Sequence, residues 1–203
     1  MPRLSYRGAV RPHSTDLCMI RTRLACASSH ARVNRDLVVT IKIRHSQPED
    51  ADAVERVLRA SYPQLMAPAY DADLLQRALP FLIKANPHLL ASTSYYIAEA
   101  GSEPVGCGGW SLEKPGTTVH EFGVGHIRHF ATSAAWVGRG VGRSIYERCE
   151  LEARAAGVFR LDCHSSRNGE PFYLALGFTR IGDMLLPLAA DLMFPGVLMS
   201  RHI

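Results

Sequence analysis

The hydrophobic positions of the chain repeat with two periods, which predict strands and helices in turn. Short runs rich in β-branched and aromatic residues, several of them alternating with polar residues, predict seven strands. Longer runs with apolar residues three and four positions apart predict four helices. The predicted strands are residues 37–44, 94–99, 105–112, 126–132, 159–163, 178–185 and 193–200, and the predicted helices are 46–62, 71–84, 144–156 and 168–176.

Local signals set the expected ends of the first two helices. Ser46 is a candidate cap, and Pro48 followed by acidic residues suits a first helical turn. Tyr62 and Pro63 predict the end of this helix, because proline lacks the N–H that an inner turn needs. Pro80 lies inside the second helical run and predicts a kink or an early end there.

The order of these elements is β-α-α-β-β-β-α-β-α-β-β. An alternation of this kind favours an α/β fold with a mixed sheet and helices on both of its faces. The 203 residues fit one domain with an appendage. We therefore expect a folded domain at 38–203 preceded by a disordered, Arg-rich extension at 1–37.

Charge separates the extension from the domain. Residues 1–40 contain seven arginines and two aspartates, which gives them a net charge of +5. Because the whole chain has a net charge of +4, the remaining residues have a net charge of −1. An upstream start codon, a transit peptide and a basic arm for an acidic partner all explain such a segment. We favour a functionally inert extension.

Composition excludes several classes of protein. No apolar run reaches the ~18 residues of a membrane span. The near-neutral domain gives no support for nucleic-acid binding. The five scattered cysteines form neither a CxxC pair nor a Cys/His spacing for zinc, so we expect no metal and reduced thiols in a cytoplasmic protein.

The most informative stretch places glycines 138, 140 and 142 between a predicted strand and a predicted helix. Glycines allow a ligand to approach the main chain, and the first N–H groups of a helix favour phosphate. A Walker loop would need a lysine that is absent here. A dinucleotide loop would need a third glycine at the position of Arg143.

A second motif follows one helix and one strand later, with Asn168 before Phe172-Tyr173-Leu-Ala-Leu-Gly177-Phe178. The two motifs together resemble the GNAT superfamily of N-acetyltransferases, over about residues 41–200. The family's loop pattern is [QR]-x-x-G-x-[GA], and the chain departs from it at Val137. The resemblance implies a GNAT-like, mostly antiparallel mixed sheet and acetyl-CoA as co-substrate.

The resemblance also implies the roles of individual residues. The cofactor loop would hold the pyrophosphate, the end of the preceding strand would pair with the pantetheine arm, and Asn168 would contact the cofactor. Tyr173 would protonate the departing thiolate. The implied cofactor-binding residues are Phe130, Ala131, Thr132, Val137, Gly138, Arg139, Gly140, Val141, Gly142, Arg143, Ser144 and Asn168.

The base that deprotonates the amine is less fixed. Some family members carry a glutamate near the position of His126, and a histidine titrates near neutral pH. Strand alternation puts His126, Arg128 and Phe130 on one face, so we expect His126 to face the substrate. His120, Glu121 and His164 are reserve candidates, and an exposed strand-end histidine is the competing interpretation of His126.

We therefore expect direct acetyl transfer from acetyl-CoA to a primary amine of a small molecule or peptide. A non-catalytic acyl-CoA sensor and an acyltransferase with another acyl group stay open, as does a homodimer. Acidic residues hint at a cationic acceptor, although solvated helix starts explain them equally well; they are Glu49, Asp50, Asp52, Asp71 and Asp73. The acceptor side is expected to involve Tyr62, Met66 and Tyr70, with Trp110 more suited to the core.

Overall fold

A computed structural model describes residues 40–203, and the extension predicted at 1–37 lies outside them. Seven strands form one sheet in the order β1-β2-β3-β4-β5-β7-β6. Every neighbouring pair is antiparallel except β4 and β5, which are parallel. The strands are β1 Ile41–His45, β2 Tyr95–Ala100, β3 Glu103–Ser111, β4 Val124–Thr132, β5 Arg160–Ser166, β6 Thr179–Ala189 and β7 Leu192–His202. The expected mixed, mostly antiparallel sheet is confirmed.

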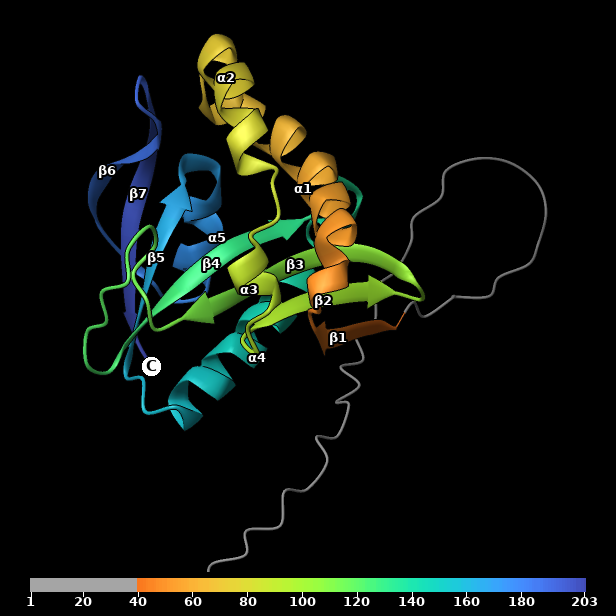
Figure 1. Cartoon of the computed structure of the whole chain (residues 1–203), viewed down its shortest axis with the longest axis vertical. Helices are drawn as coiled ribbons and strands as arrows, with labels where there is room; N and C mark the ends of the chain where they lie inside the picture. Colours follow the sequence, from red (N-terminus) through yellow and green to blue (C-terminus); the bar gives the residue numbers. More distant parts are fainter. Residues whose placement is uncertain (1–39) are drawn as a thin grey trace, which may run out of the picture.

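Helices cover both faces of this sheet (Figure 1). They are α1 Ala51–Met66, α2 Ala72–Leu82, α3 Pro87–Leu90, α4 Val141–Ala155 and α5 Glu170–Ala175, with short 3-10 turns η1 Pro48–Asp50, η2 Ala67–Ala69, η3 Ala134–Trp136 and η4 Arg167–Gly169. The predicted order holds, and the single turn α3 is the only α-helix in the described range that the sequence pattern did not predict. No described helix is long and apolar enough to cross a membrane.

The alternation of β2 shows why two helical layers are needed. Tyr95 and Ile97 pack with α1, α2 and α3, whereas Tyr96 and Ala98 pack with α4 and α5. All four side chains are buried. Burying apolar surface on both sides of a strand stabilises a three-layer arrangement, at roughly 25 cal/mol per Å² of apolar surface removed from water.

Three details of α1 and α2 differ from the sequence predictions. Ser46 does not cap a helix: its hydroxyl donates to the Leu90 carbonyl at 3.0 Å, and Gln47 takes the cap position of η1. Pro63 lies inside α1, which continues to Met66. Its exposed position on the last turns lets the helix tolerate one lost hydrogen bond, because packing of α1 against the sheet supplies most of the stability. Pro80 also lies inside α2, which ends at Leu82.

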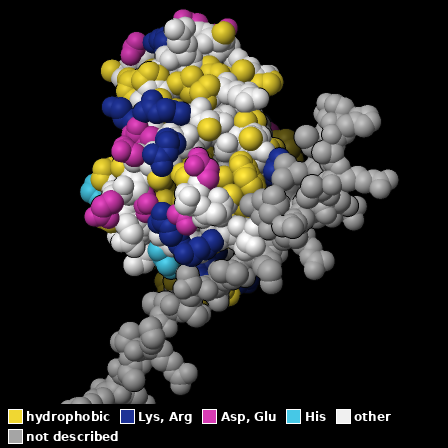
Figure 2. Space-filling view, turned by 90° about the vertical axis from the view of Figure 1, so that its right-hand side faces the viewer, with side chains coloured by type: hydrophobic (Ala, Val, Ile, Leu, Met, Phe, Trp, Pro, Cys, Tyr) yellow, Lys and Arg dark blue, Asp and Glu magenta, His cyan; other side chains and the backbone are white. Residues whose placement is uncertain are grey.

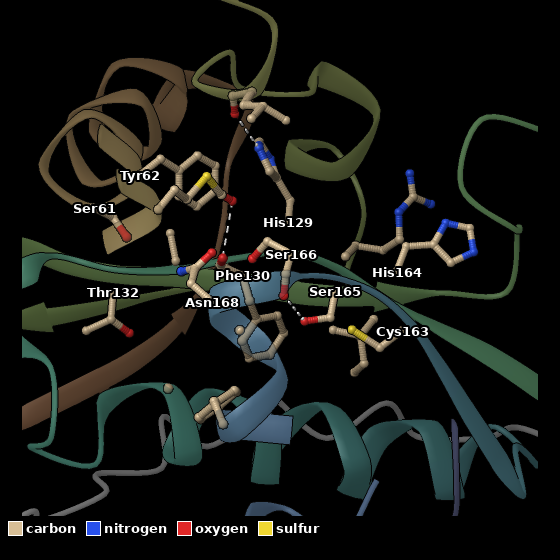
Figure 3. A pocket seen from close by; sticks show the side chains of 18 of the residues that line it. Ser61, Tyr62, His129, Phe130, Thr132, Cys163, His164, Ser165, Ser166 and Asn168 are labelled. Atoms are coloured by element: carbon tan, nitrogen blue, oxygen red, sulfur yellow. Dashed lines mark hydrogen bonds between the residues drawn. The ribbon is translucent and has the colours of Figure 1, made fainter. Parts of the chain in front are cut away.

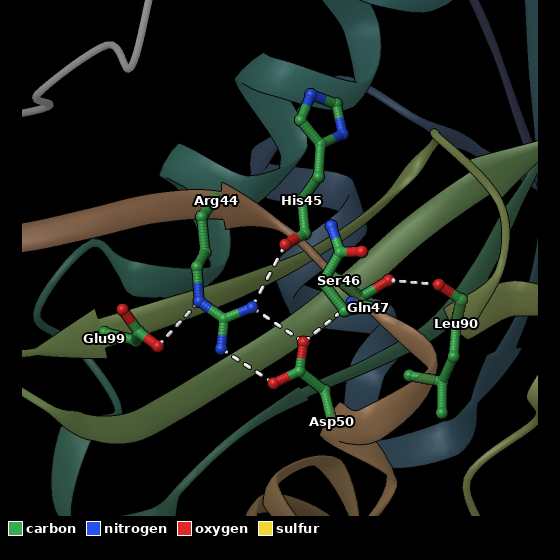
Figure 4. Close-up of polar contacts among 7 residues, drawn as sticks. All are labelled: Arg44, His45, Ser46, Gln47, Asp50, Leu90 and Glu99. Carbon is green, nitrogen blue, oxygen red and sulfur yellow. Dashed lines mark hydrogen bonds and ion pairs between the residues drawn. The ribbon is translucent and has the colours of Figure 1, made fainter.

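A polar cluster fixes β1 to the start of α1 (Figure 4). The Arg44 guanidinium donates two hydrogen bonds to the Asp50 carboxylate, at 2.7 and 2.8 Å, and a third to Glu99 at 2.7 Å. Asp50 also accepts from the Gln47 N–H at 2.7 Å. The hydrogen bonds from Arg44 lower the pKa of Asp50. This cluster joins the edge strand β1 to the start of α1.

Replacing Arg44 with methionine should lower the free energy of unfolding by about 1–2 kcal/mol at pH 7, the scale of charge-assisted hydrogen bonds that are partly buried. A carboxylate with a depressed folded-state pKa contributes stability that is lost as the pH falls through that pKa. The difference between wild type and Arg44→Met should therefore shrink below about pH 4. Urea unfolding at several pH values measures it.

The matched control is Arg59→Met, which removes an exposed pair with Glu55 on α1. Exposed pairs of this kind contribute little, so a change below about 0.5 kcal/mol is expected. Equal effects of the two substitutions would contradict the role given to the Arg44 cluster.

The outer surface is mixed in charge. Figure 2 shows basic and acidic side chains interspersed on the face turned to the viewer, with hydrophobic side chains toward the end formed by α2. The face seen in Figure 2 therefore carries no large patch of a single charge.

Candidate active site

The sheet opens where β4 and β5 separate. These two strands pair in parallel from Val124 beside Arg160 only as far as Ile127 beside Cys163. Both strands continue beyond this point, β4 to Thr132 and β5 to Ser166. The diverging ends line a cleft of about 1080 Å³ that extends to the glycine loop on one side and to α1 and α2 on the other.

A β-bulge shapes the β4 side of the cleft. Cys107 of β3 pairs with Ala131, but Gly109 pairs with Arg128, so that two residues of β4 oppose one of β3. One of the two, His129, has a positive φ of 52°, which is uncommon for a residue with a side chain. Such backbone persists only where the surroundings hold it in place.

Several contacts hold this bulge. The Tyr95 hydroxyl donates to the His129 carbonyl at 3.1 Å. The Tyr62 hydroxyl donates to the Phe130 carbonyl at 3.2 Å (Figure 3). The His129 ring donates from Nε2 to the Leu82 carbonyl at 3.0 Å. Burial lowers the pKa of His129, which keeps the ring neutral.

The bulge overturns the predicted alternation of β4. Phe130 packs with Phe172 and Tyr173 on the α4 and α5 side of the sheet. Ala131 lies among the side chains packed with α1, and Ile127 lies on the α4 side. Phe130 therefore does not share a face with Arg128. Sequence periodicity assumes an unbroken strand, and one extra residue reverses the side of every residue after it.

The glycine loop closes one end of the cleft. Gly138 and Gly140 have φ of 76° and 81°, a region that glycine adopts at no steric cost. A Cβ added at Gly138 would meet no atom within 4 Å, so the main chain there is open. At Gly142 a Cβ would lie 3.1 Å from the Phe172 ring, which explains why a small residue is needed.

Helix α4 begins at Val141, with Gly140 as its cap residue. The Ser144 N–H donates to the Gly140 carbonyl at 2.9 Å, so the N–H groups of Val141, Gly142 and Arg143 precede the first helical bond. These three residues line the cleft, but Ser144 is buried and does not. The helix therefore already uses the Ser144 N–H, and a contact of Ser144 with the cofactor stays a prediction.

The side chains of the loop differ in their positions relative to the cleft. Val137 lines the cleft and is 52% exposed. The Arg139 guanidinium lies 4.9 Å from the centre of the Trp136 ring, a cation–π distance, and Arg139 is not among the residues lining the cleft. The loop thus presents main chain to a ligand at its three glycines, next to the side chain of Val137.

Asn168 and Tyr173 complete this end of the cleft. Asn168 lies in η4 beside Phe130 and Thr132 (Figure 3). Its Oδ1 atom is buried without a hydrogen-bond partner within the described part of the chain. An orphaned buried acceptor is costly and indicates a missing donor. Tyr173 lies in α5, lines the same cleft and is 6% exposed.

The ionisation of Tyr173 and Cys163 is set by burial. Burial raises the pKa of the Tyr173 hydroxyl well above its usual value, and the neighbouring Cys163 adds to the shift. Burial also raises the pKa of the Cys163 thiol to about 12. At neutral pH the tyrosine carries its proton and the cysteine is a thiol, so Cys163 is not an activated nucleophile.

The two candidate histidines of β4 and β5 occupy different positions. His126 is 5% exposed and lines a smaller cavity of about 330 Å³, not the main cleft. His164 lines both cavities and stands beside the main cleft in Figure 3. Desolvation lowers the pKa of both rings. The expectation that His126 faces the substrate directly does not fit this placement.

The reserve candidates are separated in the same way. Glu121 lines the smaller cavity and its carboxylate pairs with Arg160 at 3.0 Å. His120 is exposed in the loop between β3 and β4 and lies 3.6 Å from the Glu113 carboxylate. Of the four candidates for the base, His164 alone lines the main cleft.

The far end of the cleft was only partly predicted. Tyr62 and Met66 line it as expected. Tyr70 does not line the cleft but stacks on Phe194, which does, and Trp110 lies in the core. Sequence reasoning missed the β6–β7 hairpin, the end of α2 and the segment after α2. Their lining residues are Phe81, Leu82, Lys84, Leu186, Pro187, Leu188 and Phe194. Their apolar positions are typical of ordinary core, so no local signal distinguished them.

Comparison with known proteins agrees with this geometry. Residues 91–180 match the family model described as an acetyltransferase (GNAT) domain. No curated protein is recognisably similar in sequence. A GCN5-related N-acetyltransferase from Rhodopseudomonas palustris superposes with a TM-score of 0.62 at 22% identity, covering 79% of this chain and 94% of that one.

Two further structures share the fold. The PaiA N-acetyltransferase of Thermoplasma acidophilum, solved in complex with coenzyme A, has a TM-score of 0.57 at 13% identity and covers 80% of this chain and 99% of its own. An acetyltransferase from Thermus thermophilus has a TM-score of 0.54 at 21% identity, with 80% and 97% coverage. The architecture is shared over nearly the whole length of each relative.

Proposed function

We propose that this chain is a GNAT acetyltransferase that transfers an acetyl group from acetyl-CoA directly to a primary amine, because residues 91–180 match the acetyltransferase (GNAT) domain model and the fold is shared with solved N-acetyltransferases. The observation that carries the proposal is the cleft at the β4–β5 opening. It combines a glycine loop at a helix start, an edge of β4 without a strand partner on the β5 side, and the protonated hydroxyl of Tyr173.

The donor would bind along one side of the cleft. The N–H groups of Val141, Gly142 and Arg143 suit a pyrophosphate, because they lie at the positive end of the α4 dipole. The main chain of residues 130–132 would pair with the pantetheine arm. Pantetheine amides supply N–H donors of the kind that the buried Asn168 Oδ1 lacks. Acetyl-CoA supplies the chemistry of an acyl thioester, which an amine attacks.

The chain's own groups account for the proton transfers. As the C–N bond forms, the thioester oxygen gains charge, and a main-chain N–H within residues 130–132 would stabilise it. As the C–S bond breaks, the Tyr173 hydroxyl donates its proton to the thiolate. The proton of the attacking amine goes to His164, which is neutral because burial lowers its pKa.

His126 takes a supporting role in this proposal. Its ring lines the smaller cavity together with His164, Asp162 and Glu121. The charge of each histidine affects the other, since His126 lowers the pKa of His164. His126 is therefore positioned to pass the proton from His164 toward the carboxylates rather than to touch the amine.

The test of the proposed function is thiol release from acetyl-CoA with a panel of amines, read with a chromogenic thiol reagent. Amine-dependent release, with the N-acetyl product identified by mass spectrometry, is the expected result. Binding of acetyl-CoA without release for any amine would favour a non-catalytic sensor. Faster release from a longer acyl-CoA would favour a different acyl donor.

Replacing His164 with glutamine should change the pH profile. In the wild type, kcat/KM should fall as the pH drops through the pKa of His164, which lies below its ordinary value of 6.5. In His164→Gln this limb should disappear, and the rate at pH 7.5 should fall about 100-fold, the lower range for loss of a general base.

The matched control is His120→Gln, which changes an exposed histidine outside the main cleft. Its profile should match that of the wild type. Retention of the acidic limb in His164→Gln would contradict the assignment of the base, and loss of that limb in His126→Gln alone would return the role to His126.

A further inference from the structure

The cleft has two chemically different ends. One end holds the glycine loop, Asn168 and Tyr173, as described above. The other lies between the end of α1, the segment after α2, the loop at residues 115–117 and the β6–β7 hairpin. In the proposed reaction the donor occupies the first end, so the acceptor must enter through the second.

The acceptor end is mainly apolar. Its apolar walls come from α1, α2, α3 and the β6–β7 hairpin, so the apolar surface surrounds a bound molecule on several sides. The aliphatic and aromatic side chains that line it are Leu65, Met66, Phe81, Leu82, Leu89, Leu186, Leu188 and Phe194. A cavity of this kind favours an acceptor with an apolar body.

The charged groups of the cleft are all basic. Among the described residues that line it, none is aspartate or glutamate. Lys84 and Arg128 stand at the acceptor end, and Arg143 stands at the donor end. Lys84 makes no ion pair within the described range. Arg128 donates to the Ser111 hydroxyl at 2.6 Å and to the Glu113 carbonyl at 3.4 Å, and the Glu113 carboxylate acts on it electrostatically without an ion pair in the described range.

The acidic residues that hinted at a cationic acceptor lie elsewhere. Asp50 is paired with Arg44, and Asp71 caps α2 by accepting from the N–H groups of Asp73 and Leu74. Glu49, Asp52 and Asp73 also lie outside the cleft lining. Helix starts explain these acids, and the expectation of a cationic acceptor loses its support.

We propose, on the basis of the proposed function, that the acceptor is a small amino acid-like molecule with an apolar body and a carboxylate that Lys84 and Arg128 recognise. Two cations in a partly dry cleft stabilise a carboxylate and repel polyamines. They also favour the neutral form of the incoming amine, because a positive neighbour disfavours a second positive charge. Neutral amine is the form that attacks the thioester.

The experiment compares amines that differ in one group. L-phenylalanine and L-leucine keep the carboxylate, their amides neutralise it, 2-phenylethylamine and isopentylamine lack it, and spermidine adds positive charge. The measured quantity is kcat/KM for thiol release from acetyl-CoA. We expect the amino acids to exceed the amides, the decarboxylated amines and spermidine at least tenfold. The amino groups of the amides are less basic than those of the amino acids, so a larger fraction of them is neutral at the assay pH. A lower rate with the amides would therefore not result from protonation of the attacking amine.

Lys84→Met tests the recognition itself. The ratio of kcat/KM for phenylalanine over 2-phenylethylamine should fall about tenfold, mainly through KM, whereas Lys42→Met on β1, outside the cleft, should keep the wild-type ratio. A wild-type preference for spermidine or the decarboxylated amines would overturn the proposal. An unchanged ratio in Lys84→Met would overturn it as well.

A second readout separates this inference from the proposed function. N-acetyl-L-phenylalanine and its amide are titrated calorimetrically into the CoA-saturated protein. Absence of turnover with every amine would refute the proposed acetyltransferase activity. The proposed ligand class would still be supported if N-acetyl-L-phenylalanine binds more tightly than its amide and if this difference in affinity becomes smaller in Lys84→Met. Equal binding of the two compounds, or binding of neither, would overturn it.

Discussion

Replacing Tyr173 with phenylalanine is expected to lower kcat by about 100- to 1000-fold while changing the KM for acetyl-CoA by less than about threefold. The substitution removes one oxygen and keeps the ring that packs against Phe130, Phe172 and Phe178. Because the hydroxyl acts only when the thiolate leaves, its loss affects the transition state rather than binding. Steady-state kinetics with an amine found by the panel measures both constants.

The control for this substitution is Tyr146→Phe. Tyr146 is a buried tyrosine of α4 whose hydroxyl accepts from Arg201 at 2.9 Å, and it does not line the cleft. Loss of this hydroxyl should lower the free energy of unfolding by about 1 kcal/mol without a comparable effect on kcat. Full activity of Tyr173→Phe would remove the tyrosine from the chemistry, whatever the control does.

Placing aspartate at Gly138 should weaken acetyl-CoA binding by about 30- to 1000-fold. A carboxylate at the loop would stand close to the pyrophosphate, and like charges a few ångströms apart near a protein surface repel with roughly 2–4 kcal/mol. Isothermal titration of acetyl-CoA into the variant measures the loss. The effect should be larger at low salt, because salt screens the repulsion.

Gly157 provides a matched control, since Gly157→Asp introduces the same charge and the same backbone strain. Its φ is 82°, against 76° at Gly138, and a Cβ at either position meets no atom within 4 Å. Gly157 lies beyond the end of α4 and outside the cleft lining. Both variants should lose similar stability, but only Gly138→Asp should lose affinity. Equal affinity losses would show that the glycine loop does not hold the donor.

Sequence patterns predicted the fold where local and tertiary preferences agree. The stripe of Val54, Val57 and Leu58 predicted the buried face of α1, and all three side chains are buried. The glycines around Gly140 predicted the loop before α4, and Gly140 caps that helix. In these places burial and backbone conformation favour the same residues, so one sequence signal suffices.

The parts that could not be predicted depend on several strands at once. The bulge at His129 needs Tyr95, Tyr62 and Leu82, three partners from distant positions, and no single stretch encodes it. Pro63 marks a helix end by local rules, yet packing carries α1 to Met66. The position of His164 in the cleft follows from where β4 and β5 part, which is a property of their pairing and not of either strand.

The hydrogen bond from Tyr62 to the Phe130 carbonyl has a consequence for how such an enzyme can change its substrate. Tyr62 belongs to the helix that walls the acceptor, whereas Phe130 belongs to the backbone proposed to hold the donor. A substitution at Tyr62 that reshapes the acceptor side also releases the strand on the donor side. New acceptor specificity is therefore more accessible through Phe81, Lys84 and Leu188, which alter the wall without loosening the bulge.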